Sequence, residues 1–403
     1  MRDILIIANF TDAPSEKGNN RFHYLAEEIN KTGNVELVTS SFSHDKKIQR
    51  TVTMEQLKTA SYKFTMLYEP SYKKNVSLRR LYCHYILGKN LEKYLRERKL
   101  PDVIYCAVPS LEVGKVAASY AMKNNIKFII DIQDLWPEAF RMVFNVPLLN
   151  KLFFYPLKQK ANFIYSSADE IIAVSQTYLK KVLKVNRKVK KGLSVYLGTD
   201  LSTFDNLAEK EKLTIKPNNE LWLGYVGTLG HSYDIKTVLD ALKLLQNKGI
   251  HNIKFIIMGD GPLKSEFEEY AYKLGVNAEF TGRLSYRKMV CILKQCDIAV
   301  NPISKGAAQS IINKHADYAA AGLPVLNTQE CSEYRNLVEE YKMGFNCENR
   351  NSRDLAEKLF ILYEDDILRE NMGQNSRKLA EEKFNRLKTY SQILTLINKD
   401  QRT

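Results

Sequence analysis

The sequence has 403 residues, of which 44% are apolar, and its formal net charge is +14. A chain of this length exceeds the size of a single hydrophobic core and predicts two domains. Its apolar runs stay below the ~18 residues needed to span a bilayer, and its six scattered cysteines form no Cys-x-x-Cys pair. These features exclude a membrane-spanning protein, a zinc ribbon and a disulfide scaffold, and we expect a cytoplasmic protein with reduced thiols.

Most of the excess positive charge lies in the first half of the chain, in residues 46–99 and 180–191. Basic surfaces attract nucleic acid, anionic lipid and phosphorylated ligands. The tyrosines near this charge are expected in helical segments: Tyr68, Tyr72, Tyr82 and Tyr85. No RNA- or DNA-reading motif accompanies them, so nucleic acid is not predicted as a partner. A solvated basic face and contact with an anionic membrane surface, on the inner face of the cell membrane, are both compatible with the pattern.

The first half alternates apolar strands with amphipathic helical segments. The predicted strands are residues 3–9, 35–40, 102–108, 126–132 and 170–175. The first strand is short and bounded by charge, which indicates a buried strand rather than a signal peptide. Near-continuous runs of Val, Ile and Leu between helices are typical of a parallel sheet that is covered on both faces.

A Gly-Asn-Asn turn follows the first predicted strand. Gly18, Asn19 and Asn20 precede a helix, and their backbone N–H groups can donate to a phosphate. Doubly wound sheets bind ligands at the carboxyl ends of their strands, where this turn is expected to lie.

The stretch DIQDLWPEAF, residues 131–140, concentrates polar side chains after another predicted strand. A ligand cleft is expected at this edge, and the side chains that the stretch would place there are Asp131, Gln133, Asp134, Trp136 and Glu138. A structural role is equally compatible, with Asp134 capping a helix that has Pro137 in its first turn. Residues 141–165 mix apolar residues with lysines, which suits either shallow membrane attachment or core helices.

The second half repeats the alternation after a polar, charged stretch. Residues 198–220 show no apolar periodicity, and we place the hinge there. The predicted strands that follow are residues 221–227, 253–259, 278–282, 297–302 and 323–328. Residues 352–399 form a run of helices, of which the last can cross back to the first domain. We therefore predict α/β domains at 1–200 and 201–380 and a C-terminal helix at 381–403.

Two short motifs follow strands of the second half. In GDGPLKSEF, Gly259 and Gly261 allow a tight turn before a helix, and turn chemistry alone also explains them. In FTGRLSYRKM, Arg283 stands at a strand end. It can pair with a diphosphate or stack on a base, or it is an ordinary surface arginine.

The stretch AAQSIINKHADYAAAGLPV, residues 307–325, is the most informative one. Small or neutral residues at a helix start let backbone N–H groups approach an anion, and the helix dipole favours negative charge there. Lys314 adds a positive charge. Gln309 and Asp317 are two helical turns apart and can face one ligand, with the carboxylate accepting hydrogen bonds from a ribose diol. A small-residue packing helix is the alternative interpretation.

Taken together, the motifs resemble retaining GT-B glycosyltransferases, most closely the glycosyltransferase family 4 members that assemble capsule and O-antigen polysaccharides. The resemblance covers nearly the whole chain and rests on the order GNNRF, DIQDLWPE, GYVGTLG, MGDGP, FTGRLSYRKM, CDIAVNP and DYAAAGLPV. It implies two Rossmann-like, doubly wound parallel-sheet domains that face a cleft, with a C-terminal helix crossing back to the first. It also implies sugar transfer from a nucleotide diphosphate with retention of anomeric configuration, without a bound metal or other cofactor.

The resemblance assigns roles by position. Asp317 takes the place of the second glutamate of the family's E-x7-E motif, which binds ribose, and Gln309 takes the place of the first, which contacts the donor sugar. In the first domain, Gln133 stands where relatives often carry His or Arg, and Asp134 is the adjacent acidic residue. The candidate catalytic residues are thus Gln133, Asp134 and Gln309. The other donor-binding residues that the resemblance implies are Gly18, Asn19, Asn20, Gly227, Thr228, Gly259, Arg283, Leu284, Ser310, Ile311, Ile312, Asn313 and Lys314.

Departures from the family pattern bear on function. The basic pair that many members place after the GYVG strand is missing, because TLGHSYDIKT supplies only His231 and Lys236. Gln309 can form hydrogen bonds but lacks the charge of a glutamate, and Asp317 carries the charge on a shorter side chain.

We predict a metal-independent bacterial glycosyltransferase. Its donor is a UDP-linked sugar, with an N-acetylated or deoxy amino sugar among the candidates, and its acceptor is a polyprenyl-diphosphate-linked saccharide. The alternative is a catalytically weak or silent nucleotide-sugar-binding partner of another glycosyltransferase. A GT-B-fold sugar-nucleotide epimerase is a more remote hypothesis, because its usual carboxylate and histidine constellation is not evident.

Overall fold

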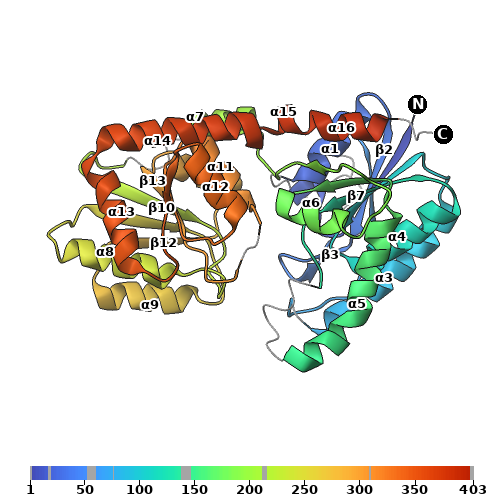
Figure 1. Cartoon of the computed structure of the whole chain (residues 1–403), viewed down its shortest axis with the longest axis horizontal. Helices are drawn as coiled ribbons and strands as arrows, with labels where there is room; N and C mark the ends of the chain where they lie inside the picture. The colour runs from blue at the N-terminus through green and yellow to red at the C-terminus, as the bar shows by residue number, and fades with distance from the viewer. Residues whose placement is uncertain are drawn as a thin grey trace. The chain divides into compact units, whose positions relative to one another are not determined.

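The computed structural model describes residues 2–16, 20–51, 60–75, 77–137, 147–210, 216–307 and 310–399. The chain divides into two compact units. The first comprises Met1–Val195 with Tyr390–Thr403, and the second comprises Tyr196–Thr389. Each unit is built around one large parallel sheet with helices on both faces, as the alternation of strands and helices predicts (Figure 1).

The sheet of the first unit has seven strands in the order β5-β2-β1-β6-β7-β8-β9, all parallel. The strands are β1 (Asp3–Ile7), β2 (Asn34–Ser40), β5 (Lys63–Leu67), β6 (Val103–Val108), β7 (Lys127–Ile132), β8 (Glu170–Ala173) and β9 (Leu193–Ser194). The five strands predicted for this half are confirmed. The sequence prediction misses the edge strands β5 and β9, because they are short and lack a continuous apolar run. A separate antiparallel pair joins β3 (Phe42–Ser43) to β4 (Ile48–Gln49).

Alternate residues of the first sheet face two layers of helices. Ile4 and Ile6 of β1, with Leu37 of β2, share one core cluster with α1 (Arg21–Asn30) and α16 (Ser391–Asn398). The other face is covered by three helices that lie side by side in Figure 1. These are α3 (Leu78–Glu97), α4 (Leu111–Lys123) and α5 (Pro147–Ser167), followed in the chain by α6 (Gln176–Leu183).

Buried contacts hold the C-terminal helix in the first unit. Arg21 lies 4.9 Å from the centroid of the Tyr390 ring, and its Nε is 3.2 Å from the Asp131 carboxylate. The Lys127 ammonium donates to the carbonyl of Leu396 at 2.6 Å, near the end of α16, where the helix dipole favours a cation. The last helix therefore packs on the first sheet, as the resemblance implies.

Two of the tyrosines near the basic charge are not helical. Tyr82 and Tyr85 lie in α3, but Tyr68 and Tyr72 lie in the segment between β5 and α3. The prediction of helical segments is wrong for this second pair. Tyr68 directly follows the unpredicted strand β5, and Pro70 disfavours a helix before it.

The sheet of the second unit has six parallel strands in the order β12-β11-β10-β13-β14-β15. The strands are β10 (Leu221–Val226), β11 (Ile253–Met258), β12 (Ala278–Gly282), β13 (Ile298–Asn301), β14 (Val325–Asn327) and β15 (Gly344–Asn346). The five strands predicted for this half are confirmed, and the three-residue edge strand β15 is missed.

In the second sheet, too, alternate residues of a strand face opposite layers of helices. Leu223 and Tyr225 of β10 pack with α8 (Ile235–Gln246), α9 (Lys264–Leu274) and α13 (Ser352–Glu364). Trp222 of the same strand belongs to the opposite cluster. The helices of that cluster are α7 (Leu201–Lys210), α10 (Tyr286–Leu293), α11 (Asn313–Ala321) and α12 (Ser332–Glu340). The chain then continues through α14 (Asp366–Leu379) and α15 (Arg386–Thr389).

Part of the predicted hinge is a core helix. Residues 201–210 form α7, and its Leu201 and Phe204 are buried against α10. The prediction of an irregular linker is wrong over this stretch. Leu201, Phe204 and Leu207 follow the spacing of one helical face, but the surrounding charges obscure that pattern in the sequence.

The structure also bears on thiols and membrane spans. The six cysteines are free, and five of them are buried. No helix within the described ranges is long and apolar enough to cross a membrane.

Candidate active site

The candidate donor site lies at the carboxyl edge of the second sheet. The strand order reverses at β10, because β11 and β12 lie on one side of it and β13 to β15 lie on the other. In doubly wound sheets, ligands bind outside the carboxyl ends of the strands at such a switch point. The motifs at 227–230 and 259–263 follow β10 and β11, and the described parts of the third motif, residues 302–307 and 310–317, follow β13. These motifs therefore lie at this edge.

Two glycines let the loops of this edge approach each other. Gly227 has φ of +147°, and a Cβ atom there would lie 2.7 Å from Lys314 Nζ. A Cβ atom on Gly259 would lie 1.7 Å from the carbonyl oxygen of Gly227. The structure thus brings together Gly227, Gly259 and Lys314, three of the residues that the sequence predicts for donor binding.

Lys314 is buried without a hydrogen-bond partner for its ammonium among the described residues. Its side chain begins in the first turn of α11, and the residue is only 7% exposed. Nζ lies 4.2 Å and 4.1 Å from the ring centroids of Tyr225 and Tyr233, so cation–π attraction offsets part of the lost hydration. Burial lowers the pKa of Lys314 well below its ordinary value. An anionic ligand at this edge would supply the missing counter-charge.

Asp317 lies further along α11 and already has a partner. Its Oδ1 accepts a hydrogen bond from the Tyr286 hydroxyl at 3.0 Å, and that hydroxyl lies 3.0 Å from Thr199 Oγ1. Burial raises the pKa of Asp317 to about 6, although Tyr286 and Arg386 both oppose this rise. A ribose diol that bound this carboxylate would therefore compete with Tyr286 for one of its oxygens.

A network of buried amides fixes the backbone where α11 begins. Asn301 Nδ2 donates to Asn327 Oδ1 at 2.8 Å and to Gln329 Oε1 at 3.2 Å. Gln329 Nε2 donates to the carbonyl of Ser310 at 2.8 Å. The backbone N–H of Ile312 donates to His315 Nδ1 at 3.3 Å. The sequence prediction misses Asn301, Asn327, Gln329 and His315 as supports of the site. Asn301 and Asn327 end β13 and β14, and Gln329 follows β14. These strand-end positions could have indicated that the three residues lie at the site.

The other predicted donor-site residues of the second unit differ in exposure. Thr228 is exposed, and its carbonyl accepts from the Tyr225 hydroxyl at 2.8 Å. Arg283 is exposed on the loop after β12, whereas Leu284 packs on the core. In the first turn region of α11, Ser310 and Ile311 are buried, Ile312 is half-buried and Asn313 is exposed. The Ile311 side chain belongs to the core cluster, so only its backbone is available to a ligand.

Three predicted residues of the first unit, Asn20, Gln133 and Asp134, lie at the carboxyl edge of its own sheet. Asn20 caps α1, because its Oδ1 accepts from the Phe22 N–H at 2.9 Å. Gln133 follows β7, and its Nε2 is buried without a partner among the described residues. Asp134 accepts from the Leu135 N–H at 2.8 Å and from the Tyr178 hydroxyl at 3.3 Å, while burial raises its pKa. Gly18, Asn19 and Gln309 lie outside the described residues.

The raised pKa of Asp317 predicts how the stability of the folded protein changes with pH. The folded protein binds more protons at this residue than the unfolded chain between pH 3.8 and about 6. Stability therefore falls as pH rises through this window, and the ionised carboxylate opposes folding above it. We expect Asp317→Asn to raise the thermal midpoint at pH 8, by a free energy on the order of 1–3 kcal/mol, with little difference at pH 4. Equal thermal midpoints of the parent protein and Asp317→Asn at pH 8 would show that burial of the ionised Asp317 carboxylate does not destabilise the fold.

Residues 206–379 match the family model Glycosyl transferases group 1. The matched range runs from within α7 to the end of α14 and includes the whole donor edge described above.

Two curated relatives are similar to a large part of the chain. The capsular polysaccharide biosynthesis glycosyltransferase CapM of Staphylococcus aureus is 24% identical over 239 residues, which cover 57% of this chain and 62% of CapM. The second relative is from Campylobacter jejuni and is named GalNAc-alpha-(1->4)-GalNAc-alpha-(1->3)-diNAcBac-PP-undecaprenol alpha-1,4-N-acetyl-D-galactosaminyltransferase. It is 26% identical over 196 residues, which cover 48% of this chain and 47% of that enzyme. The match thus spans less than two thirds of either relative.

The crystal structure of HepE from Anabaena in complex with UDP is similar over almost the whole chain. Its TM-score is 0.69 at 16% identity, with 98% of this chain and 99% of HepE covered. At this identity the likeness shows the fold. The chain therefore has the two-domain GT-B fold, and most of its second unit matches the family model of group 1 glycosyltransferases.

Proposed function

We propose that this protein is a retaining glycosyltransferase that moves a sugar from a UDP-linked donor to a lipid-linked saccharide in bacterial surface polysaccharide synthesis. CapM is named as a glycosyltransferase of capsular polysaccharide biosynthesis, and the name of the Campylobacter enzyme gives a saccharide linked to PP-undecaprenol. HepE binds UDP in its crystal structure. An N-acetylated or deoxy amino sugar is our candidate for the transferred group. Retention follows from the resemblance of the ordered motifs, in which Gln133, Asp134 and Gln309 hold the catalytic positions.

The unpartnered ammonium of Lys314 is the observation that carries this proposal. Sugar transfer leaves a nucleoside diphosphate, whose negative charge grows as the glycosidic bond breaks. A buried cation at the carboxyl edge of the sheet stabilises that charge more strongly than an exposed one, because little water screens it. The N–H groups at the start of α11 add the positive end of the helix dipole. Together these groups can stabilise the leaving diphosphate without a bound metal.

Incubation of the full chain with labelled UDP-sugars and a polyprenyl-diphosphate-linked saccharide tests the proposal. The expected product carries one more sugar in the anomeric configuration of the donor, as read by NMR, and forms equally well with EDTA. UDP binding without transfer or hydrolysis, across a panel of donors and acceptors, would refute the enzyme and support the silent alternative. An inverted anomer would refute retention alone.

One observation favours the alternative of a catalytically weak or silent partner subunit. Lys236, one of the two basic residues after β10, forms an ion pair with Glu266 at 2.6 Å on the surface. His231, the other, is exposed. Neither makes a described contact with Lys314 or Asp317. The other buried cation near this edge, Arg386, acts on Asp317 and donates to the carbonyl of Leu197 at 3.0 Å. A site without the basic pair after β10 would bind UDP and transfer sugar slowly.

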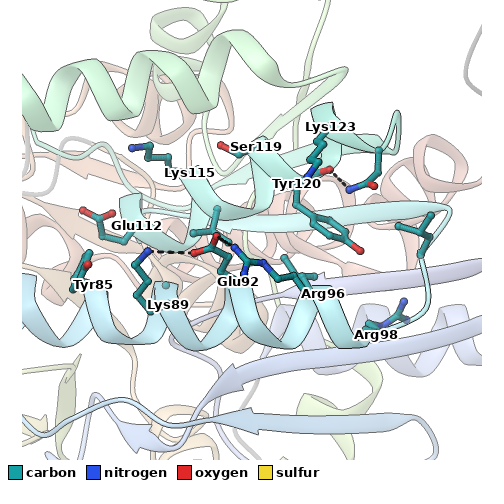
Figure 2. A pocket seen from close by; sticks show the side chains of 15 residues that line it. Tyr85, Lys89, Glu92, Arg96, Arg98, Glu112, Lys115, Ser119, Tyr120 and Lys123 are labelled. Carbon is teal, nitrogen blue, oxygen red and sulfur yellow. Dashed lines mark hydrogen bonds and ion pairs between the residues drawn. The ribbon is translucent and has the colours of Figure 1, made fainter.

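We further propose that the α3–α4 face of the first unit contacts an anionic membrane surface. A groove of about 660 Å³ runs between these helices, and Figure 2 shows Lys115 and Lys123 of α4 along it. Neither lysine forms an ion pair with a described residue, whereas Lys89 and Arg96 of α3 both pair with Glu92. Exposed apolar side chains lie on the same helices: Leu78, Tyr82 and Tyr85 of α3 and Met122 of α4. Lysines without an ion pair to a described residue, on helices that also carry exposed apolar groups, suit the headgroup region of a membrane.

Replacing both Lys115 and Lys123 with Glu should weaken binding to phosphatidylglycerol vesicles by about tenfold or more, since each lysine near such a surface contributes ~1 kcal/mol. Co-sedimentation at low and high salt measures this change, which should shrink as salt rises. The control is Lys248→Glu with Lys273→Glu, an equal charge change on exposed residues of the second unit. If both double variants lose binding equally, the effect is one of net charge and the α3–α4 face has no special role.

A further inference from the structure

A second group of buried polar and aromatic side chains lies at the carboxyl edge of the first sheet. We call it the Arg80 cluster, and its members are Phe10, Glu69, Tyr72, Arg80, His84 and Trp136. Phe10 follows β1, Glu69 and Tyr72 follow β5, and Trp136 follows β7. Arg80 and His84 come from the first two turns of α3. Segments far apart in the sequence thus converge at the edge where doubly wound sheets bind ligands.

Aromatic rings surround the guanidinium of Arg80. Its central carbon lies 4.5 Å from the centroid of the Trp136 ring, 5.4 Å from that of Phe10 and 5.6 Å from that of Tyr72. The His84 ring stacks on Trp136 with a centroid distance of 5.6 Å and an interplanar angle of 3°. The rings fix the position of the cation and keep water from most of its surface.

Three polar groups of the cluster are buried without hydrogen bonds to described residues. They are Arg80 Nε, His84 Nε2 and Glu69 Oε1, on residues that are 7%, 2% and 1% exposed. His84 Nε2 and Glu69 Oε1 lie 3.7 Å apart, too far for a hydrogen bond. Buried polar atoms in folded proteins almost always have partners, so three such atoms in one cluster indicate a missing ligand.

The same edge holds more unpartnered groups outside the cluster. The side-chain amide of Asn9, the hydroxyl of Thr11 and Nε2 of Gln133 are buried without a hydrogen bond to a described residue. All three residues follow β1 or β7, as Phe10 and Trp136 do. Amides and hydroxyls of this kind suit the hydroxyl groups of a sugar, to which they both donate and accept.

The charge balance of the cluster favours an anion. One guanidinium nitrogen of Arg80 donates to the carbonyl of Asn75 at 2.7 Å, and Lys47 Nζ lies 4.9 Å from the Tyr72 ring. Burial raises the pKa of Glu69 to about 7, whereas burial and the charge of Arg80 lower the pKa of His84 to about 3. Near neutral pH, Arg80 and Lys47 therefore face a Glu69 carboxyl group that is only partly ionised and a neutral imidazole. Arg50 adds a third positive charge near Glu69, and Asp134, whose pKa burial also raises, is the other carboxyl group that acts on Arg80.

We propose that the Arg80 cluster binds a sugar phosphate, with Arg80 on the phosphate and Glu69 and His84 on sugar hydroxyls. The proposal deepens the proposed function, on which it rests, because a phosphate-linked saccharide is the acceptor class inferred above. A purely structural ion pair would leave fewer unpartnered atoms, since Arg80 and Glu69 would then satisfy each other. Both residues instead keep an atom that forms no hydrogen bond with a described residue.

Trp136 offers a direct reporter of binding at this cluster. The chain has two tryptophans, and the other, Trp222, lies in the second unit. The Trp222→Phe variant therefore leaves Trp136 as the sole indole fluorophore. We would saturate this protein with UDP and then titrate it with glucose 1-phosphate or inorganic phosphate. The expected result is a saturable change in Trp136 emission, with tighter binding of glucose 1-phosphate than of phosphate.

Arg80→Gln should weaken this binding at least tenfold, and Glu69→Gln should weaken glucose 1-phosphate more than phosphate. The matched control is Arg79→Gln, because Arg79 is the exposed neighbour on the same helix. Arg80→Lys, which keeps the charge but loses Nε, should bind with intermediate affinity and serves if Arg80→Gln does not fold. No emission change, or equal affinities of the Arg79→Gln and Arg80→Gln proteins, would overturn the proposal. Equal affinity for phosphate and glucose 1-phosphate would overturn its sugar part.

UDP binding, measured by calorimetry on the same variants, separates this proposal from the proposed function. Arg80→Gln should bind UDP like the parent protein, because Lys314 lies in the second unit. A Trp136 response in a protein that binds no UDP would support the sugar-phosphate site and refute the donor site. UDP binding without a Trp136 response to glucose 1-phosphate would support the donor site and refute the sugar-phosphate site at the Arg80 cluster.

Discussion

Replacing Lys314 with Met is expected to weaken UDP binding by about 10- to 100-fold, while the ligand-free protein becomes more stable. The loss of affinity follows from the removal of a charge-assisted contact, which contributes about 1.5–3 kcal/mol. The gain in stability follows from the removal of a buried amine that has no hydrogen-bond partner among the described residues, a cost on the order of 1–3 kcal/mol. The unbranched thioether can occupy the space between Tyr225 and Tyr233.

Proton uptake gives the Lys314 prediction a second readout. Burial lowers the pKa of the ammonium in the free protein, and a bound diphosphate would raise it again. UDP binding should therefore take up a proton and weaken as pH rises. Calorimetry in buffers of different ionisation enthalpy measures this uptake, which should disappear in Lys314→Met. Lys248→Met, at an exposed lysine of the second unit, should change neither affinity nor uptake. Unchanged UDP affinity in Lys314→Met would remove the main support for the donor site.

Gly259→Ala is expected to destabilise the second unit and to abolish UDP binding. The added Cβ would lie 1.7 Å from the Gly227 carbonyl oxygen, so the backbone of one loop must move. Such overpacking costs on the order of 1–3 kcal/mol, and the movement displaces the loop that contacts Lys314. Thermal unfolding followed through Trp222 and UDP calorimetry measure the two effects.

Gly230→Ala is the matched control for this substitution. Gly230 lies in the same loop as Gly227, has no positive φ, and its nearest neighbour to an added Cβ is Thr228 Cγ2 at 3.8 Å. This variant should keep both the unfolding midpoint and the UDP affinity of the parent protein. A Gly259→Ala protein that behaved like Gly230→Ala would show that the close approach of the two loops is unimportant.

Much of the fold was predictable from local patterns. Apolar runs such as residues 126–132 and 253–259 predict buried strands, and the structure confirms them as β7 and β11. The missed strands β5, β9 and β15 are short edge strands, in which one neighbouring strand is absent and the apolar run is weak. The helix α7 was missed because charged residues surround its buried positions. Long-range packing decided each of these elements.

The candidate site was predictable in part. The turn after a strand indicated Gly259, the helix start indicated Lys314, and the family resemblance implied Gly227; the structure brings these three residues together. The ribose role of Asp317 and the roles of Gln133, Asp134 and Gln309 stay predictions. The hydrogen bond from Tyr286 to Asp317 was not predictable, because its two residues are far apart in the sequence and no local pattern pairs them.

The sequence by itself determined the alternation of strands and helices, the order of the motifs and their positions at strand ends. These features depend on residues within one or two helical turns of each other, whose periodicity a single chain displays. Only the tertiary structure decided which polar atoms lose water and which find partners. It buried Lys314 between Tyr225 and Tyr233, and it placed Arg80 against the Trp136 ring with its Nε unbonded to any described residue. Desolvation depends on every segment that packs around a group, and that is information no local stretch of sequence contains.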